Sequence, residues 1–146
     1  MMVLPTRHTE LPGSDEGGEV REWVIPSNDG GDAETTYVRF KGRLLGAHAS
    51  RPRHKDRWFE VRIFRVIDED GRVHYIVHRT GATRLPGEID LFTVDHAYSA
   101  SEVLEILVTR GEDRPVRFTI PAARCISQAT RFDADLEQAW LDRAVV

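Results

Sequence analysis

Histidine is the residue type in this sequence that most directly suggests metal or acid–base chemistry, because imidazole binds transition metals and titrates near neutral pH. The chain has six histidines, of which His74 and His78 are closest in sequence. Four residues apart on one strand, they would share a face but lie about 13 Å apart. One ion cannot bind both, and no His-Glu-x-x-His or cysteine-rich spacing indicates zinc. We therefore predict no metal site and no cofactor, and expect histidines that face solvent.

Nucleophilic and acid–base catalysis have no clear signature either. Cys125 is the only cysteine, and its apolar surroundings, Ala-Ala-Arg-Cys-Ile, are typical of a buried structural thiol. Glu88 and Asp90 would share a strand face as a carboxylate pair, but acidic pairs recur throughout this sequence. No Gly-x-Ser-x-Gly elbow and no phosphate-binding glycine motif is present. The sequence therefore predicts no catalytic residue.

A concentration of basic residues in the middle of the chain is the remaining pattern. Arginines and lysine alternate with apolar residues on one segment, fill the loop that follows, and recur on the next segment. Such a surface could neutralise several phosphates, with Trp58 or Phe64 stacking on a base. The predicted contact residues for a nucleic acid or an acidic protein, the basic patch, are Arg39, Lys41, Arg43, Arg51, Arg53, His54, Lys55, Arg57, Trp58, Arg62 and Arg65.

Formal charge changes sign along the chain in three blocks. Residues 1–35 carry a net charge of −6, residues 36–84 of +7 and residues 85–146 of −5. Because opposite charges attract, acids of either flank could cover the basic centre within one molecule or across a dimer. The alternatives are an external anionic partner and an enzyme pocket, and the sequence leaves all three interpretations open.

These observations favour a non-enzymatic binding or regulatory module whose basic sheet face and loop contact a nucleic acid or an acidic protein. The acidic N-terminal segment would modulate that contact by competing for the patch. One alternative is a structural or assembly protein, such as a phage or mobile-element component, whose arm and patch join the subunits of a homo-oligomer. A small enzyme of unknown class is the second alternative.

The sequence predicts strands followed by helices, and these elements must position the candidate residues. Alternating apolar residues predict strands at 35–45, 57–67, 72–79 and 87–94, and a fifth strand or a linker at 116–120. An Asp-Gly pair at 70–71 predicts a hairpin between the second and third strands. Helical spacing and capping residues predict helices at 100–109, 121–128 and 133–143.

Composition divides the chain into two parts. Residues 1–35 are acidic and rich in proline and glycine, which predicts a flexible arm, although Trp23 could dock on the domain or on a partner. Residues 36–146 are predicted to form a single domain. The predicted fold class is α+β, with an antiparallel sheet of four to five strands packed with two to three C-terminal helices. No segment is apolar enough to span a membrane or direct export, so we expect a cytoplasmic protein.

The segments Val38 to Gly46, Phe59 to Val66 and Arg72 to Arg79 resemble small actinobacterial proteins of the EXLDI type. The resemblance extends over about residues 36–128 and implies a family whose biochemical role is unassigned. The family's ribbon-helix-helix-like segment and its Glu-x-Leu-Asp-Ile signature have no counterpart in this sequence. The resemblance therefore implies no catalytic or binding residue.

Overall fold

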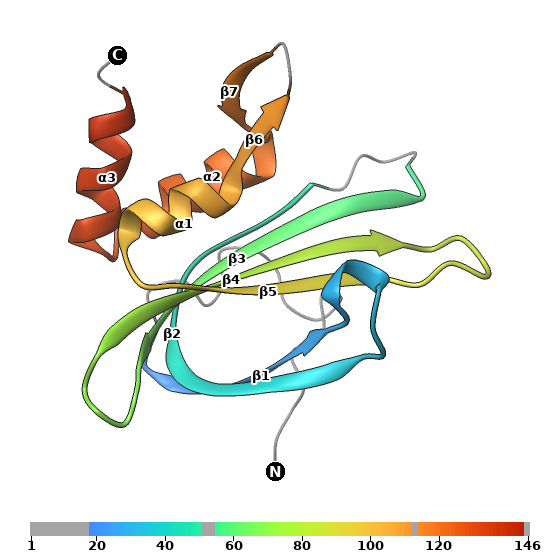
Figure 1. Ribbon diagram of the computed structural model, residues 1–146, viewed down its shortest axis with the longest axis horizontal. Coiled ribbons are helices and arrows are strands. Elements are labelled where there is room, and N and C mark those ends of the chain that lie inside the picture. The colour runs from blue at the N-terminus through green and yellow to red at the C-terminus, as the bar shows by residue number, and fades with distance from the viewer. Residues whose placement is uncertain (1–17, 51–54, 112–113, 145–146) are drawn as a thin grey trace.

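The structure is a computed structural model that describes residues 18–50, 55–111 and 114–144. Five strands come first, followed by three helices, with a small hairpin between the first two of them in the chain (Figure 1). The strands are β1 (Arg21–Ser27), β2 (Thr36–Ser50), β3 (Arg57–Ile67), β4 (Val73–Thr83), β5 (Leu91–Ala97), β6 (Val108–Gly111) and β7 (Arg114–Phe118). The helices are the short η1 (Asp29–Gly31), α1 (Ala100–Leu107), α2 (Ile120–Ala129) and α3 (Ala134–Ala144).

Strands β1 to β5 form one antiparallel sheet in which each strand pairs with its neighbour in sequence. The predicted hairpin between β3 and β4 is confirmed: the Gly71 N–H donates to the Asp68 carbonyl at 3.0 Å, and Gly71 has a φ of 78°. Strands β6 and β7 form a separate two-stranded sheet. The α+β class, with an antiparallel sheet and three C-terminal helices, is therefore confirmed.

Strand β2 is 15 residues long and serves two neighbours. Its first half pairs with β1 and its second half with β3, and the register shifts between Leu44 and Gly46. Gly46 lies directly against α2, because a Cβ there would come within 2.4 Å of the Cys125 carbonyl oxygen. A bulge of this kind bends a strand. As a result, β1 and the first half of β2 curl across one face of β3, β4 and β5, which we call the inner face (Figure 1).

Each face of the sheet buries an apolar cluster. On the inner face, Trp23 of β1 and Phe40 of β2 pack edge-to-face on Phe64 of β3, with centroid distances of 4.9 and 5.0 Å. On the outer face, Val77 of β4 is fully buried with Leu104 of α1, in a cluster to which all three helices contribute. Because side chains alternate along a strand, the same strands supply both clusters.

The apolar cluster of the predicted arm is a strand of the domain. Trp23 is only 3% exposed, and its indole N–H donates to the Gly42 carbonyl at 3.0 Å. The interpretation in which Trp23 docks on its own domain is therefore confirmed. The boundary drawn at residue 35 differs from the structure, because residues 21–31 form β1 and η1. Residues 1–17 of the predicted arm lie outside the described residues.

Three further boundaries differ from the sequence expectation. The fifth strand of the main sheet is β1, whereas the candidate at 116–120 overlaps β7 of the small sheet. Helix α1 ends at Leu107, because β6 begins at the next residue, and β5 begins only at Leu91. Across the described ranges, none of the helices is both long enough and apolar enough to cross a membrane.

Asn28, between β1 and η1, joins β1 to β5 and is 3% exposed. Its backbone N–H donates to the Phe92 carbonyl at 3.1 Å, and its side-chain oxygen accepts from the Phe92 N–H at 2.8 Å. Its side-chain nitrogen donates to the Asp90 carbonyl at 2.8 Å. Together these bonds join the end of β1 to the start of β5. They also satisfy polar groups that are buried away from water.

His78 is a second link across the inner face. It is 5% exposed, so the expectation that the histidines face solvent is wrong for this residue. Its Nε2 donates to the Pro26 carbonyl at 3.0 Å, which connects β4 to β1. Burial, together with the positive charge of Arg62, lowers the pKa of His78 to about 4. The imidazole is therefore neutral over most of the physiological range.

This pKa predicts a loss of stability in mild acid. His78 titrates near 6.5 in the unfolded chain and near 4 in the folded one, so between these values only the unfolded chain binds the proton. Stability is therefore fully present above about pH 6.5 and falls as the pH approaches 4, by about 3 kcal/mol in total. Denaturant unfolding across this range should show a smaller fall for His78→Gln. The exposed His96 provides the control, and an equally steep fall in His78→Gln and His96→Gln would contradict the assignment.

Candidate functional site

Three residues of the basic patch lie together on β2. Arg39, Lys41 and Arg43 share its outer face, as the alternation predicted. Lys41 is exposed, whereas Arg39 Nε lies 3.4 Å from a carboxylate oxygen of Glu22. The Arg43 guanidinium lies 5.5 Å from the ring centroid of Phe132. Even within this group, the three charges have different surroundings.

The other residues of the patch are divided among separate places. Trp58 and Arg62 are buried on the inner face of β3, at 9% and 8% exposure, while Arg65 faces outward. Lys55 and Arg57 are exposed at the opposite end of β3 from Arg65. Outside the described residues lie Arg51, Arg53 and His54. Binding of a nucleic acid or an acidic protein by these residues stays a prediction.

Carboxylates from both acidic flanks reach the basic centre. Among the described residues, ion pairs that join the blocks are Arg39 with Glu22, Arg57 with Glu88, Arg65 with Asp133 and Arg79 with Asp95. Exposed pairs contribute little to stability, but they reduce the field that a distant partner would experience. Among the three interpretations of the charge blocks, the described residues favour neutralisation within the molecule.

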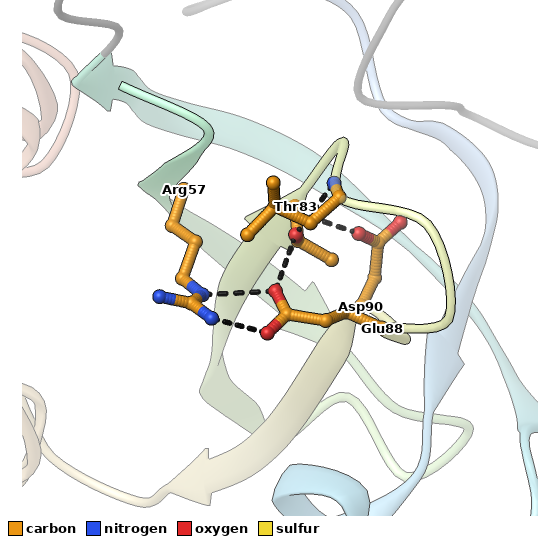
Figure 2. Close-up of polar contacts among 5 residues, drawn as sticks. Arg57, Thr83, Glu88 and Asp90 are labelled. Carbon is orange, nitrogen blue, oxygen red and sulfur yellow. Dashed lines mark hydrogen bonds and ion pairs between the residues drawn. The ribbon is translucent and has the colours of Figure 1, made fainter.

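Glu88 connects Arg57 to the loop between β4 and β5 (Figure 2). Arg57 Nε donates to Glu88 Oε1 at 2.9 Å, and its Nη2 donates to Oε2. The Thr83 hydroxyl donates to Glu88 Oε1 at 2.7 Å, and the Thr83 N–H donates to Asp90 Oδ1 at 3.0 Å. The hydrogen bonds from Arg57 and Thr83 lower the pKa of Glu88 to about 2. Both carboxylates of the candidate pair are thus engaged in shaping this loop.

A pocket of about 410 Å³ lies between the outer face of the sheet and helices α1 and α2. This volume falls within the range of small-molecule sites, which are concave and mostly apolar with a few polar groups. Strands β3, β4 and β5 form one wall, and the end of α1 with the start of α2 forms the other. The lining includes Phe59, Arg79, Gly81, Leu91, Thr93 and Leu107.

The strand register places a glycine between two large apolar residues in the wall of the pocket. Phe59, Gly81 and Leu91 lie side by side across β3, β4 and β5. Because Gly81 has no side chain, the Leu91 side chain lies close over it, with three of its atoms within 4 Å of the position a Cβ would take. A Cβ at Gly81 would lie 3.5 Å from the Leu91 Cβ, an ordinary contact, so no neighbour prevents a side chain there.

The mouth of the pocket exposes apolar side chains. Phe59 is 67% exposed and Leu91 is 42% exposed, near the start of β3 and at the start of the edge strand β5. Scattered single apolar residues are common on protein surfaces, but a group around a concave site marks an interaction surface. The exposed Phe59 ring and Leu91 side chain are therefore available to a molecule in the pocket.

Arg79 and Glu60 are the charged residues in the described lining, and Arg79 is ion-paired. Its Nη2 donates to Asp95 Oδ2 at 2.7 Å, and its Nη1 lies 3.4 Å from the Ile106 carbonyl at the end of α1. Its Nε is buried and makes no hydrogen bond to the described part of the chain. The guanidinium is thus engaged by Asp95 on one side and by the end of α1 on the other.

Among the described residues that line the pocket, no nucleophile lies beside a general base. The described part of the lining contains no histidine, cysteine or serine, and Cys125 is fully buried as predicted. Within the described ranges, no group of three or more metal-binding side chains is placed to hold an ion. With one ion-paired arginine and an apolar wall, the arrangement is suited to binding.

A second recess of about 770 Å³ lies on the inner side, where β2 leaves β3. His74 and His96 line it with their rings stacked 5.5 Å apart, and desolvation together with His96 lowers the pKa of His74. Lys41, Asp68 and Glu69 bring charges of both signs to its edge. This mixed, charged rim resembles a solvated surface more than an apolar site, so we regard the sheet–helix pocket as the stronger candidate.

Sequence reasoning did not identify this pocket. The only available signal was the adjacency of Trp58 and Phe59: two large apolar residues in succession on a strand must face opposite sides. Which of the two would be exposed depends on what covers each face. Arg79 gave no signal, because its partner Asp95 lies on the neighbouring strand.

Comparison with protein-family models, with curated proteins and with solved structures finds no match to this chain. The resemblance to EXLDI-type proteins is therefore untested and stays a prediction.

The network around Glu88 can be tested by titration. We expect Arg57→Gln to raise the pKa of Glu88 from about 2 toward its ordinary 4.5, because the largest contribution to the shift is the hydrogen bond from Arg57. The measurement is a side-chain carboxyl NMR titration. Arg84→Gln is the matched control, since Arg84 pairs instead with Asp56 at 3.4 Å. A Glu88 pKa that stays low in Arg57→Gln would show that this ion pair does not form in solution.

Proposed function

We propose that this protein is a non-enzymatic binding module whose sheet–helix pocket holds a small, largely apolar molecule. The observation that carries the proposal is the pocket of about 410 Å³, whose lining includes Gly81 and the exposed side chains of Phe59 and Leu91. Pockets that bind small molecules are typically concave and mostly apolar, as this one is. The proposal therefore assigns the pocket to a ligand.

The energetics support an apolar occupant. Covering exposed apolar surface contributes about 25 cal/mol per Å², so each ~100 Å² removed from water would contribute roughly 2.5 kcal/mol. Phe59 adds a flat ring on which an aromatic or alicyclic body can pack. Because strands and helices form the walls, little conformational entropy would be lost on binding.

The test is binding of N-phenyl-naphthylamine, an uncharged fluorophore, followed by fluorescence. We expect Phe59→Ala to weaken binding about tenfold, because it removes one wall of the mouth. Gly81→Val should abolish binding by filling the floor, and valine is well suited to a strand. Circular dichroism and thermal unfolding would establish that both variants remain folded.

Tyr98→Ala is the matched control, because Tyr98 is an exposed aromatic residue, at 71%, that does not line the pocket. Its affinity for the fluorophore should equal that of the native protein. If folded Gly81→Val bound the fluorophore as tightly as the native protein, the pocket would not be the site.

Contact with an anionic macromolecule is the second candidate function. Lys41 and Lys55 favour it, because both are exposed and have no carboxylate partner among the described residues. The structural or assembly alternative would use the same residues between subunits. Since other cations of the centre are ion-paired, we expect any such contact to be weak and strongly dependent on salt.

An electrophoretic shift with DNA, RNA and polyglutamate across salt concentrations tests this second candidate. The full-length protein should shift one of them at about tens of micromolar, and Lys41→Glu with Lys55→Glu should remove the shift. Arg131→Glu, at an exposed position on the helical side, is the control. Light scattering on the same samples distinguishes assembly, which requires a mass above that of the monomer. No shift by the native protein would exclude the anionic partner.

A further inference from the structure

We propose that His74 and His96 form a binding site for a zinc ion at the second recess. The two residues lie on the neighbouring strands β4 and β5, and both line this recess on the inner side of the sheet. His74 Nε2 and His96 Nδ1 are 3.5 Å apart. The zinc site is separate from the sheet–helix pocket, whose described lining includes neither histidine.

The separation of the two nitrogens fits a tetrahedral zinc ion. Zinc binds imidazole nitrogen at about 2.0–2.1 Å, and two ligands at the tetrahedral angle are then roughly 3.4 Å apart. The observed 3.5 Å is close to this value, so small rotations of the two rings bring both nitrogens onto one ion. A square-planar ion such as Cu²⁺ needs its adjacent nitrogens at about 2.8 Å, which requires a larger movement.

The strand register brings the two histidines together. Ile76 pairs with His96, and His74 lies two residues before Ile76 on the same face of β4. Such diagonal neighbours on paired strands are within reach of large side chains. The Tyr98 ring packs on His74 with a centroid distance of 5.6 Å, so the His74 ring is partly oriented before an ion binds. Spacing along the chain does not reveal this pair, because its members are 22 positions apart.

Charges of both signs surround the recess. Asp68 and Glu69, in the turn between β3 and β4, attract a cation, whereas Arg39 and Lys41 repel it. Asp68 Oδ1 accepts two backbone N–H groups of the turn, at 2.9 and 3.1 Å, and is held there. No third metal-binding side chain in the described part of the chain is placed to complete the site. The remaining positions of the ion are therefore left for water.

The first test is a calorimetric titration of the full-length protein with zinc chloride at neutral pH. Structural zinc sites have four protein ligands and this site has two, so we expect roughly half of their binding free energy. The corresponding dissociation constant is about 1–200 µM. Magnesium chloride is the matched salt and should give no heat of binding, because Mg²⁺ selects oxygen ligands.

Single substitutions assign the ligands. His74→Gln and His96→Gln should each weaken zinc binding at least about tenfold, because each removes one of two protein ligands. His48→Gln is the matched control, since His48 on β2 does not line the recess, and its affinity should equal that of the native protein. Circular dichroism establishes that the variants are folded.

A second measurement identifies the nitrogen atoms without a substitution. In long-range ¹H–¹⁵N NMR spectra of the native protein, we expect zinc to shift Nε2 of His74 and Nδ1 of His96 together. Shifts confined to other histidines, or no binding at about 1 mM zinc, would overturn the site. Native affinity in a folded His74→Gln or His96→Gln variant would overturn it as well.

Discussion

Trp23 and Phe40 pack on Phe64, and this contact brings the hairpin of β1 and β2 across the inner face of the sheet. Both faces of β3 and β4 are apolar, so a fold that covered only one of them would leave a large surface in water. Asn28 fixes the hairpin by hydrogen bonds to β5. With the inner face covered by the chain's own strands, the outer face depends on the helices alone. Because α1 and α2 are short, the pocket remains at the end of the sheet that they do not fill.

The fold also brings the acidic flanks of the chain close to its basic centre. The sheet places the basic centre between two acidic flanks, and Glu22 of one flank and Asp133 of the other reach arginines on β2 and β3. The Arg39–Glu22 pair is exposed and therefore weak, whereas the carboxylate of Asp133 is buried. Asp133 has a further role, because it accepts a hydrogen bond from the Tyr75 hydroxyl at 3.0 Å and caps α3 through the Leu136 N–H. Charge neutralisation and docking of the last helix are therefore parts of one arrangement.

The sequence predicted the elements whose signals are local. Alternation revealed β2, β3 and β4, and capping residues such as Ser99, which accepts from the Glu102 N–H, marked the helices. Strand β1 was missed because Trp23 and its two successors are all buried, so alternation is absent. The burial of His78 was not predicted, because alternation separates the two faces of a strand but does not show that both faces of this sheet are covered. The pocket and its ion pairs depend on contacts between distant segments, and no local pattern contains them.

Two glycines show how packing and function can be separated. A Cβ at Gly46 would come within 2.4 Å of a helix carbonyl, so glycine is required there for α2 to pack on β2. At Gly81 the nearest atom would lie at 3.5 Å, and alanine would be accommodated. Glycine within a strand costs about 0.5–1 kcal/mol relative to alanine. The fold does not require glycine at position 81 and is weakened by it, whereas a side chain there would occupy space at the wall of the pocket.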